Sequence, residues 1–240
     1  NVFIGNGAGR NSVAGSQNAV LGNSAFSNNI TGSQSAAFGH SALFNNSHGD
    51  ENAAFGYSAL FSNGSGDRNA AFGHSALFTN LIGIENVAFG HSALFSNTGD
   101  FNSAMGFEAL KRNISGSENS AFGYKALSFN TTGSINSAFG SYALASNTSG
   151  GYNTAFGHKA LYNTNSGSFN TAFGYSALYN NNIGGGNTAF GHSALATNTA
   201  GFDNVAIGRN ALFYNETGNF NTAIGYNSGT LSPLSSLDNT

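Results

Sequence analysis

Apolar and polar positions recur along this chain with a period of 17 residues. One unit covers residues 153–169 as NTAFGHKALYNTNSGSF, and the next covers residues 170–186 as NTAFGYSALYNNNIGGG. Fourteen units start in succession, and the step between starts is 17 residues except for the 16 residues 86–101. A fixed period of this length is typical of solenoids, in which each repeat stacks on the one before it. We number the positions of the unit from 1 to 17.

The pattern within one unit predicts short strands. Positions 1–5 read N-x-A-F-G, positions 6–9 read x-x-A-L, and a polar stretch with Asn at position 12 and Gly at position 15 completes the unit. Two glycines and several asparagines leave no apolar stripe at the spacing of a stable helix. The sequence therefore predicts an all-β fold, a parallel β-solenoid (β-roll) of about 14 coils. It is expected to be continuous over 1–228, with an irregular last coil, a cap or a junction to further sequence at 229–240.

Large apolar residues at positions 4 and 9 are expected to form two columns that fill the core. Burying one Phe and one Leu contributes about 3–6 kcal/mol. Ordering the backbone costs roughly 1–2 kcal/mol for each of the residues in a coil, so one coil is expected to fold only against its neighbours. The expected core columns are Phe38, Phe55, Phe72, Phe89, Phe122, Phe139, Phe156, Phe173 and Phe190, and Leu43, Leu60, Leu77, Leu94, Leu161 and Leu178.

Positions 3 and 8, beside the Phe and the Leu, are Ala in almost every unit. Alternation along a strand would point them to the opposite face, and a strip of small apolar residues on an outer face suits close packing against another solenoid. We therefore expect lateral association between copies, with three-fold symmetry. The alternative is that the Ala columns line a narrow interior and the aromatic residues lie outside. The residues expected at the association surface are Ala155, Ala160, Ala172, Ala177, Ala189 and Ala194.

Composition narrows the class of protein further. Charged residues are 7% of the chain and the net charge is −3, so there is no electrostatic footprint for a nucleic acid. No run of 18 apolar residues occurs, which argues against insertion into a membrane. The chain has no cysteine, which removes disulfides and thiolate metal sites and is compatible with an extracellular location.

Histidine gathers at position 6, where it alternates with tyrosine. His74 and His91 lie on consecutive coils and are the best candidates for a pair of metal ligands. No carboxylate joins them, and a metal site needs a full ligand set. The favoured interpretation is therefore that His and Tyr form a mixed stacking column at the surface. No set of nucleophile, base and acid recurs or converges. We expect neither catalysis, nor a metal, nor a cofactor.

Two further columns leave alternatives open. Position 10 is aromatic in seven units, and such rings would bind sugars or a partner if exposed but would form a corner or interface column if buried. Ser or Thr at position 2, from Ser103 to Thr222, is a column that an ice-binding face would use, although an inward direction shared with position 4 is expected. The residues at position 10 are Phe44, Phe61, Phe78, Phe95, Tyr162, Tyr179 and Phe213.

Six asparagines at position 12 begin N-x-Ser/Thr sequons. Their recurrence in one column would place glycans in a row along a fibre, although turn composition alone also produces such matches. The candidate glycosylation sites are Asn29, Asn63, Asn113, Asn130, Asn147 and Asn215.

The repeat resembles two kinds of fibrous protein. The segments N-T-A-F-G-Y-S-A-L (170–178) and N-V-A-I-G-R-N-A-L (204–212) resemble the N-S-V-A-I-G repeat in the heads of trimeric autotransporter adhesins. They are more similar to the N-T-A-I-G-x-x-A-L-x-x-N-x-x-G arrays of bacterial and phage tail-fibre-like proteins. The resemblance extends to about Ser228 and implies a left-handed, trimeric β-roll that acts as an adhesive head or shaft. Adhesin heads have shorter units, with Ile or Val where this chain has Phe and Leu.

These observations predict a structural component of an extracellular fibre or filament. We expect a homo-oligomer built by lateral and end-to-end association, located outside the cell, at its surface or on a virion or phage-tail-like particle. The first alternative is a tail-fibre shaft that binds glycans or a cell-surface receptor through the aromatic columns at positions 6 and 10. An ice-binding solenoid is the second alternative.

Overall fold

The computed structural model describes residues 1–230. This part of the chain is all-β, contains no helix, and forms a parallel β-solenoid of about 13 turns with a repeat of about 17 residues. The predicted fold class is therefore confirmed, while the three-fold association stays a prediction. The fourteenth unit starts at Asn221 and continues beyond the described residues. Nearly all of the cap or junction expected at 229–240 lies outside them as well.

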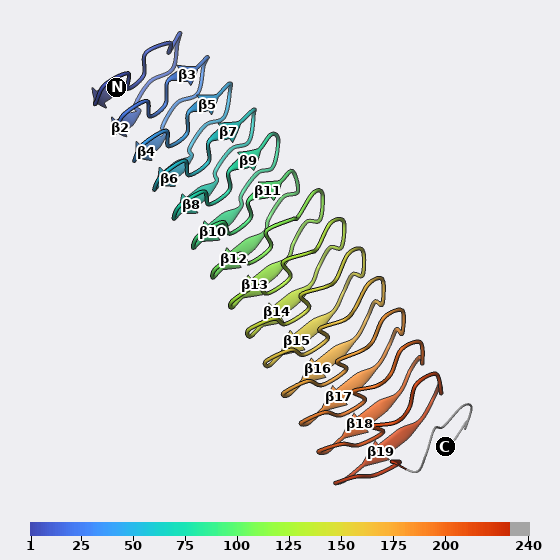
Figure 1. The fold of residues 1–240 in the computed structure, drawn as a ribbon. Coiled ribbons are helices and arrows are strands. Elements are labelled where there is room, and N and C mark those ends of the chain that lie inside the picture. Colours follow the sequence, from blue (N-terminus) through green and yellow to red (C-terminus); the bar gives the residue numbers. More distant parts are fainter. Residues whose placement is uncertain (231–240) are drawn as a thin grey trace. The chain divides into compact units, whose positions relative to one another are not determined.

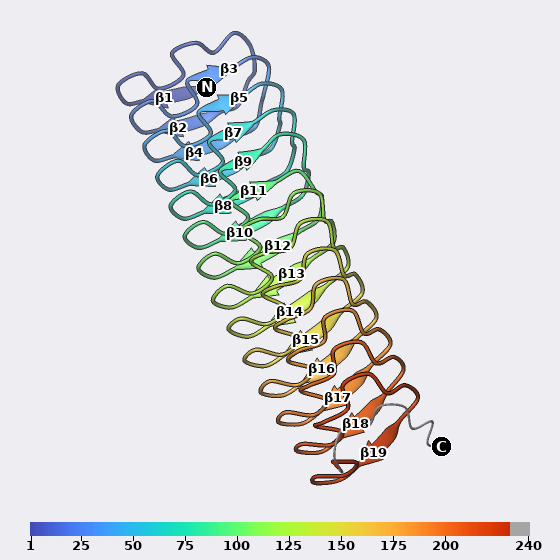
Figure 2. The ribbon, with the colours of Figure 1, turned by 45° about the vertical axis from the view of Figure 1, so that its right-hand side comes forward.

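The chain divides into two compact units, residues 1–119 and 120–240. The first unit, blue to green in Figure 1, contains two parallel rows of strands. Positions 2–4 form the first row: β1 (Val2–Ile4), β2 (Ala19–Leu21), β4 (Ala36–Phe38), β6 (Ala53–Phe55), β8 (Ala70–Phe72), β10 (Val87–Phe89) and β12 (Ser103–Met105). Positions 11–12 form the second: β3 (Asn28–Asn29), β5 (Asn45–Asn46), β7 (Ser62–Asn63), β9 (Thr79–Asn80) and β11 (Ser96–Asn97). The loops beside β2, β4, β6 and β8 lie over one another at one edge of this unit (Figure 2).

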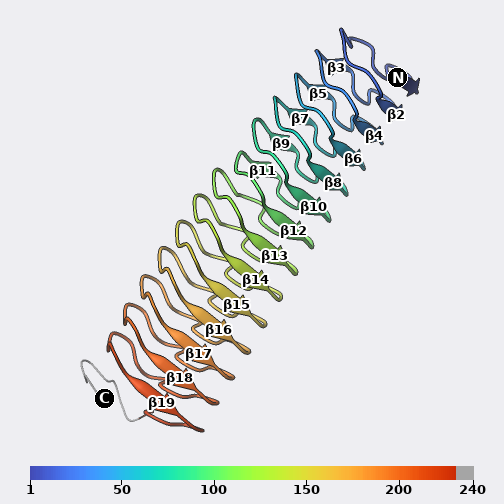
Figure 3. The same cartoon turned by 180° about the vertical axis from the view of Figure 1, so that it is seen from behind.

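The second unit, yellow to red in Figure 3, keeps the row made by positions 2–4. At position 12 its backbone turns locally, because the amide of Asn181 donates to the carbonyl of Leu178 in the same coil (3.3 Å). Asn113, in the coil that follows the 16-residue unit, already makes this bond to Leu110. The strands of this row are β13 (Ser120–Phe122), β14 (Ser137–Phe139), β15 (Thr154–Phe156), β16 (Thr171–Phe173), β17 (Thr188–Phe190), β18 (Val205–Ile207) and β19 (Thr222–Ile224).

Neighbouring strands pair in register, with equivalent positions of consecutive repeats opposite each other. Ala155 pairs with Ala172, and Phe156 pairs with Phe173. A constant repeat length therefore converts every position of the sequence repeat into a column of identical or similar side chains. Each column then lies either on the surface or in the core of the solenoid along its whole length.

The interior is lined by positions 1, 3, 8, 9 and 12. Ala155, Ala160 and Leu161 are fully buried, and their equivalents in the coils from residue 18 to residue 220 are at most 2% exposed. Leu161 adopts the left-handed region with a φ of 51°, which costs an L-residue roughly 1–2 kcal/mol. Full burial of a Leu side chain contributes about 1.5–3 kcal/mol, so burial offsets the backbone strain. All the leucines expected in the core lie there.

The phenylalanines expected in the core lie on the outside. Phe89, Phe156 and Phe190 are 54%, 50% and 49% exposed, and the other six Phe of this column are of intermediate exposure. The six Ala residues expected at the association surface have no exposed area and point into the coil. Both expectations are therefore wrong, and the alternative orientation is the one found.

The physical reason is the width of the coil. The side-chain amide of Asn52 at position 1 reaches the carbonyl of Gly66 at position 15 of the same coil (2.8 Å), and Asn63 at position 12 reaches the same carbonyl (2.7 Å). Single Asn side chains thus bridge the interior. One large side chain at position 9 (Leu in most coils, Phe26 in the second) and two small apolar ones fill the remaining space, so no room is left for a second large side chain from position 4.

Glycine at position 5 is required by both conformation and space. Gly174 has a φ of +135°, and a Cβ built on it would lie 2.5 Å from the carbonyl oxygen of Gly191 in the next coil. Such a φ disfavours any side chain. A side chain at this position would therefore meet the backbone of the next coil.

Candidate interaction surfaces

Two columns of asparagine run through the interior and hold the coils together. At position 1, the side-chain oxygen of Asn153 accepts from the backbone amide (3.0 Å) and the side-chain amide (3.1 Å) of Asn170 in the next coil. At position 12, the side-chain amide of Asn63 donates to the oxygen of Asn46 (2.8 Å). Buried polar groups are tolerated only when they are hydrogen-bonded, and these ladders supply the bonds.

The sequons at position 12 are part of this ladder. The side-chain amide of Asn147 donates to Asn130 (2.8 Å) and to Gly150 (2.9 Å), and that of Asn215 donates to Asn198 (3.3 Å) and to Gly218 (3.0 Å). A glycan would be attached to this same nitrogen. Because all six candidates, Asn29, Asn63, Asn113, Asn130, Asn147 and Asn215, are at most 1% exposed, the folded coil offers no site for the sugar. The glycosylation expectation is therefore wrong for the folded chain.

The ladder at position 12 is interrupted by Thr164. The Thr164 hydroxyl donates to the carbonyl of Leu161 in its own coil (3.0 Å). The buried side-chain oxygen of Asn147, one coil earlier, finds no donor among the described residues. The side-chain amide of Asn181, one coil later, donates to Gly184 (2.8 Å).

The outward side chains of positions 2 and 4 make a continuous face on each unit, which we call the phenylalanine face. On the first unit it combines Ala36, Ala53 and Ala70 of position 2 with the Phe column of position 4. On the second unit position 2 is Ser or Thr in every described coil except that of Val205, as in Thr171 beside Phe173. The Phe rings stack along the column with centroids 4.9 Å apart for Phe38 and Phe55, at 3° between planes. The Ser/Thr column thus points outward, against the expectation, and alternates with bulky apolar rings.

The aromatic columns at positions 6 and 10 also lie at the surface. His40, Tyr57 and His74 stack with centroids 4.9 Å apart, and Tyr57 is 52% exposed. At position 10, Phe44 and Phe61 stack at 5.0 Å and are of intermediate exposure. The question of whether these aromatic columns are exposed or buried is therefore answered. Position 6 forms an exposed stacking column, and position 10 forms a half-buried one.

The histidines do not assemble a metal centre. The rings of His74 and His91 stack face to face at 4.9 Å, and the Nδ1 atom of each lies 3.0 Å from the hydroxyl of the following Ser. Within residues 1–230, no group of three or more His, Cys, Asp or Glu side chains is placed to hold an ion. His74 and His91, the best candidates for a pair of ligands, are members of a stack, which is the arrangement favoured in the sequence analysis.

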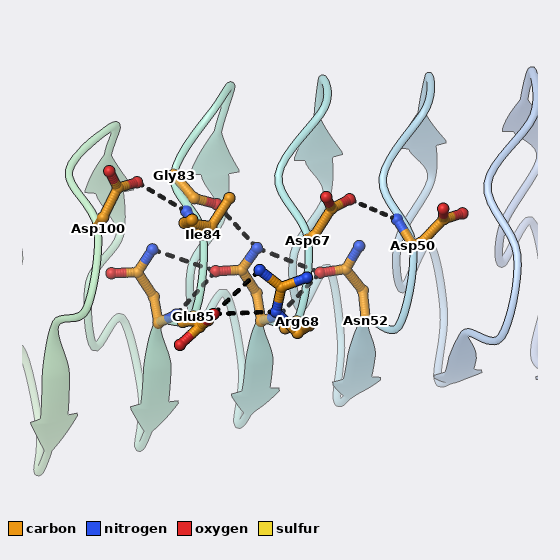
Figure 4. A network of polar contacts seen from close by, with 10 residues as sticks. Asp50, Asn52, Asp67, Arg68, Gly83, Ile84, Glu85 and Asp100 are labelled. Atoms are coloured by element: carbon orange, nitrogen blue, oxygen red, sulfur yellow. Dashed lines mark hydrogen bonds and ion pairs between the residues drawn. The ribbon is translucent and has the colours of Figure 1, made fainter.

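Carboxylates at position 16 of the first unit bind backbone. The Asp67 carboxylate accepts from the amide of Asp50 (2.8 Å), and the Asp100 carboxylate accepts from the amide of Ile84 (2.9 Å), as Figure 4 shows. Beside them, Arg68 and Glu85 form an exposed ion pair at 3.0 Å. Exposed pairs of this kind contribute about 0–1 kcal/mol, so these charges link consecutive coils and leave no acidic pocket.

No family model matches the chain, and neither the curated proteins nor the solved structures compared with it include a match. Within residues 1–230 there is also no helix with the length and hydropathy needed to cross a bilayer. The surfaces themselves therefore carry the functional argument.

Proposed function

We propose that the protein is a structural segment of a fibre and that its copies associate laterally through the phenylalanine face. The observation that supports this is the exposed Phe column at position 4. Soluble monomers rarely expose contiguous apolar patches of more than a few hundred Å². Here each coil adds one large apolar residue of intermediate or greater exposure and, in every coil of the first unit except that of Ser103, an Ala or Val beside it.

A second copy of this chain is the partner that fits this face best. The rings recur at 4.9 Å, and another copy presents rings with the same period, so that the two rows can interdigitate over many coils. The face carries no charged side chain at position 2 or 4 of the described coils, so it offers nothing to a charged partner. The lateral association predicted from the sequence is therefore proposed here as well. The surface that carries it is the Phe column and not the Ala columns.

The test is the concentration dependence of mass, measured by sedimentation equilibrium. Phe139→Ser, Phe156→Ser and Phe173→Ser are combined in one variant. Phe156 is 50% exposed, and Phe139 and Phe173 are of intermediate exposure. Burying the exposed part of each ring on association contributes about 0.5–1.5 kcal/mol, so the triple variant should raise the dissociation constant at least tenfold. Three-fold symmetry predicts a monomer–trimer equilibrium for the unmodified chain.

A matched control carries the same number of Phe→Ser changes in another column. Phe44→Ser, Phe61→Ser and Phe78→Ser lie at position 10, away from positions 2 and 4. This variant should remain associated, with the far-ultraviolet circular dichroism of both variants checked against the parent. A chain that is monomeric at high concentration, or equal loss of association in both variants, would refute the proposal.

A second candidate function is binding of a glycan or receptor by the position 6 column. The supporting observation is the exposure of its stacked rings, with Tyr57 and Tyr175 about half exposed. Flat exposed rings offer apolar faces to a sugar ring. Binding on a glycan array that is lost in Tyr57→Ser, but kept in the triple variant of the phenylalanine face, would favour this function over self-association alone.

A further inference from the structure

The half-buried aromatic column at position 10 is interrupted twice by Ala in the second unit, with different outcomes. Ala145 lies next to Tyr162 in this column, and Ala196 lies between Tyr179 and Phe213. Removing one ring from a column of stacked rings leaves a gap about one ring thick, unless another side chain fills it.

At Ala145 the chain fills the gap itself. Position 7 of this coil is Tyr142, where seven of the fourteen coils have Ser. Its ring lies edge-on to Tyr162 with centroids 6.0 Å apart, and edge-on to Tyr124 at 5.2 Å. Hydrogen bonding to Tyr124 and partial burial raise the pKa of Tyr142 above its ordinary value, as expected for a phenol held between two others. Ala145 is left 3% exposed.

At Ala196 no aromatic side chain takes the place of the missing ring, and Ala196 itself is 6% exposed. Position 7 of this coil is Ser193, and a groove of about 340 Å³ opens here along coils of the second unit. Tyr175, Tyr179 and Phe213 line it, together with Ser176, Asn180, Ser193, Thr197 and Lys159 around Ala196. Volumes of about 300–1,000 Å³ are typical of sites for small molecules.

The spacing of the walls selects the shape of an occupant. Tyr179 and Phe213 belong to coils two steps apart, which is roughly 10 Å at about 4.8 Å per coil. A ring placed midway would have its centroid about 5 Å from each wall, within the 4.5–7 Å range of stacked aromatic pairs. The intact part of the column shows the same step, since Tyr162 and Tyr179 stack at 5.2 Å.

The polar lining selects the charge of the occupant. Lys159 is the one charged residue lining this groove, and its Nζ lies 5.8 Å from the centroid of the Tyr162 ring. No carboxylate lines the groove, so an anionic substituent would meet a cation and no opposing charge. Hydroxyl and amide groups of Ser193, Thr197 and Asn180 border the same space.

From this geometry we propose that the gap at Ala196 is a binding site for a small planar aromatic carboxylate. The aromatic ring takes the place of the missing ring between Tyr179 and Phe213, and the carboxylate faces Lys159. The site uses positions 6, 7, 10 and 11 and none of the phenylalanine face, so it goes beyond the proposed role in self-association.

The test uses the full chain and 4-hydroxybenzoate as the probe, followed by saturation-transfer NMR and calorimetric titration. One site for each chain is expected. Ala196→Phe restores the aromatic residue found elsewhere in this column and should weaken binding at least tenfold, because it occupies the gap. Lys159→Gln should weaken binding of 4-hydroxybenzoate up to about fivefold, the range of an exposed ion pair, and leave binding of uncharged 4-methylphenol unchanged.

The matched control is Ser27→Phe, which adds the same ring at position 10 of the first unit and leaves the groove untouched. It should bind 4-hydroxybenzoate like the parent. The proposal is overturned if the parent chain shows no binding at millimolar probe, or if Ala196→Phe binds as well as the parent. It is also overturned if glucuronate competes for the site with equal affinity, because the groove would then select a sugar acid rather than an aromatic ring.

Discussion

Replacing Thr164 by Asn should stabilise the solenoid, because it repairs the interrupted asparagine ladder. The new side-chain amide would donate to the buried oxygen of Asn147, which finds no donor among the described residues. The new side-chain oxygen would accept from Asn181, whose amide donates to Gly184. Two coils later the intact arrangement is visible, where Asn198 donates to Asn181 (2.6 Å) and to Gly201 (3.1 Å).

The magnitude follows from the bonds gained and lost. Satisfying a buried acceptor recovers about 1–3 kcal/mol, and each additional hydrogen bond contributes about 0.5–1.5 kcal/mol. The substitution removes the bond from the Thr164 hydroxyl to Leu161, which costs a similar 0.5–1.5 kcal/mol. The expected net gain is about 1–3 kcal/mol.

Amide hydrogen exchange is the suitable assay, because stacked repeats can open locally and a single global midpoint would average the effect. Protection of the amides in residues 147–184 should rise roughly 5- to 150-fold, at about 1.4 kcal/mol for each factor of ten. Asn198→Thr is the matched control, because it introduces the same interruption elsewhere in the ladder. It removes the 2.6 Å bond to the oxygen of Asn181 and leaves that oxygen only the longer bond from Asn187 (3.4 Å), so protection should fall.

The reasoning is refuted if Thr164→Asn leaves protection unchanged or lowers it while Asn198→Thr lowers it. That result would mean that the ladder is saturated without an Asn in this coil, and that the oxygen of Asn147 is satisfied in solution by a group other than a ladder neighbour.

Three further substitutions test other parts of the fold. Ser35→Asn should stabilise by about 1–2 kcal/mol in urea unfolding, because Ser35 is the one interruption of the ladder at position 1 and binds the next coil through its hydroxyl alone (3.2 Å). Gly174→Ala should lower the free energy of unfolding by about 3 kcal/mol or more, measured by thermal unfolding, because of its positive φ and the nearby carbonyl. Gly151→Ala is the control: its Cβ would lie 3.0 Å from its nearest neighbour, and the substitution should cost about 1 kcal/mol or less. Leu161→Ala should lower the free energy of unfolding by about 2–5 kcal/mol, whereas Phe156→Ala should lower that of the isolated chain by about 1 kcal/mol or less. Equal losses of stability, measured by calorimetry, would contradict the assignment of Leu to the interior and Phe to the surface.

The period of the sequence by itself determined the class of fold. An almost constant 17-residue step requires coils stacked in register, and the two invariant glycines mark places where backbones approach one another too closely for a Cβ. The leucine column could be assigned to the core from sequence, because one large aliphatic residue for each coil has no other place to be buried.

Which side of each strand faces inward depends on the closed coil and could not be predicted from the alternation of residues. Ala155 and Phe156 are both apolar, so alternation along the strand predicts two apolar faces. It does not say which of the two faces is buried. The choice comes from the width of the closed coil, which asparagine side chains bridge and which holds one large side chain at position 9, either Leu or Phe26, and no second one from position 4. The same narrowness turns the sequon asparagines inward and leaves the Phe column outside, where we propose that a second copy covers it.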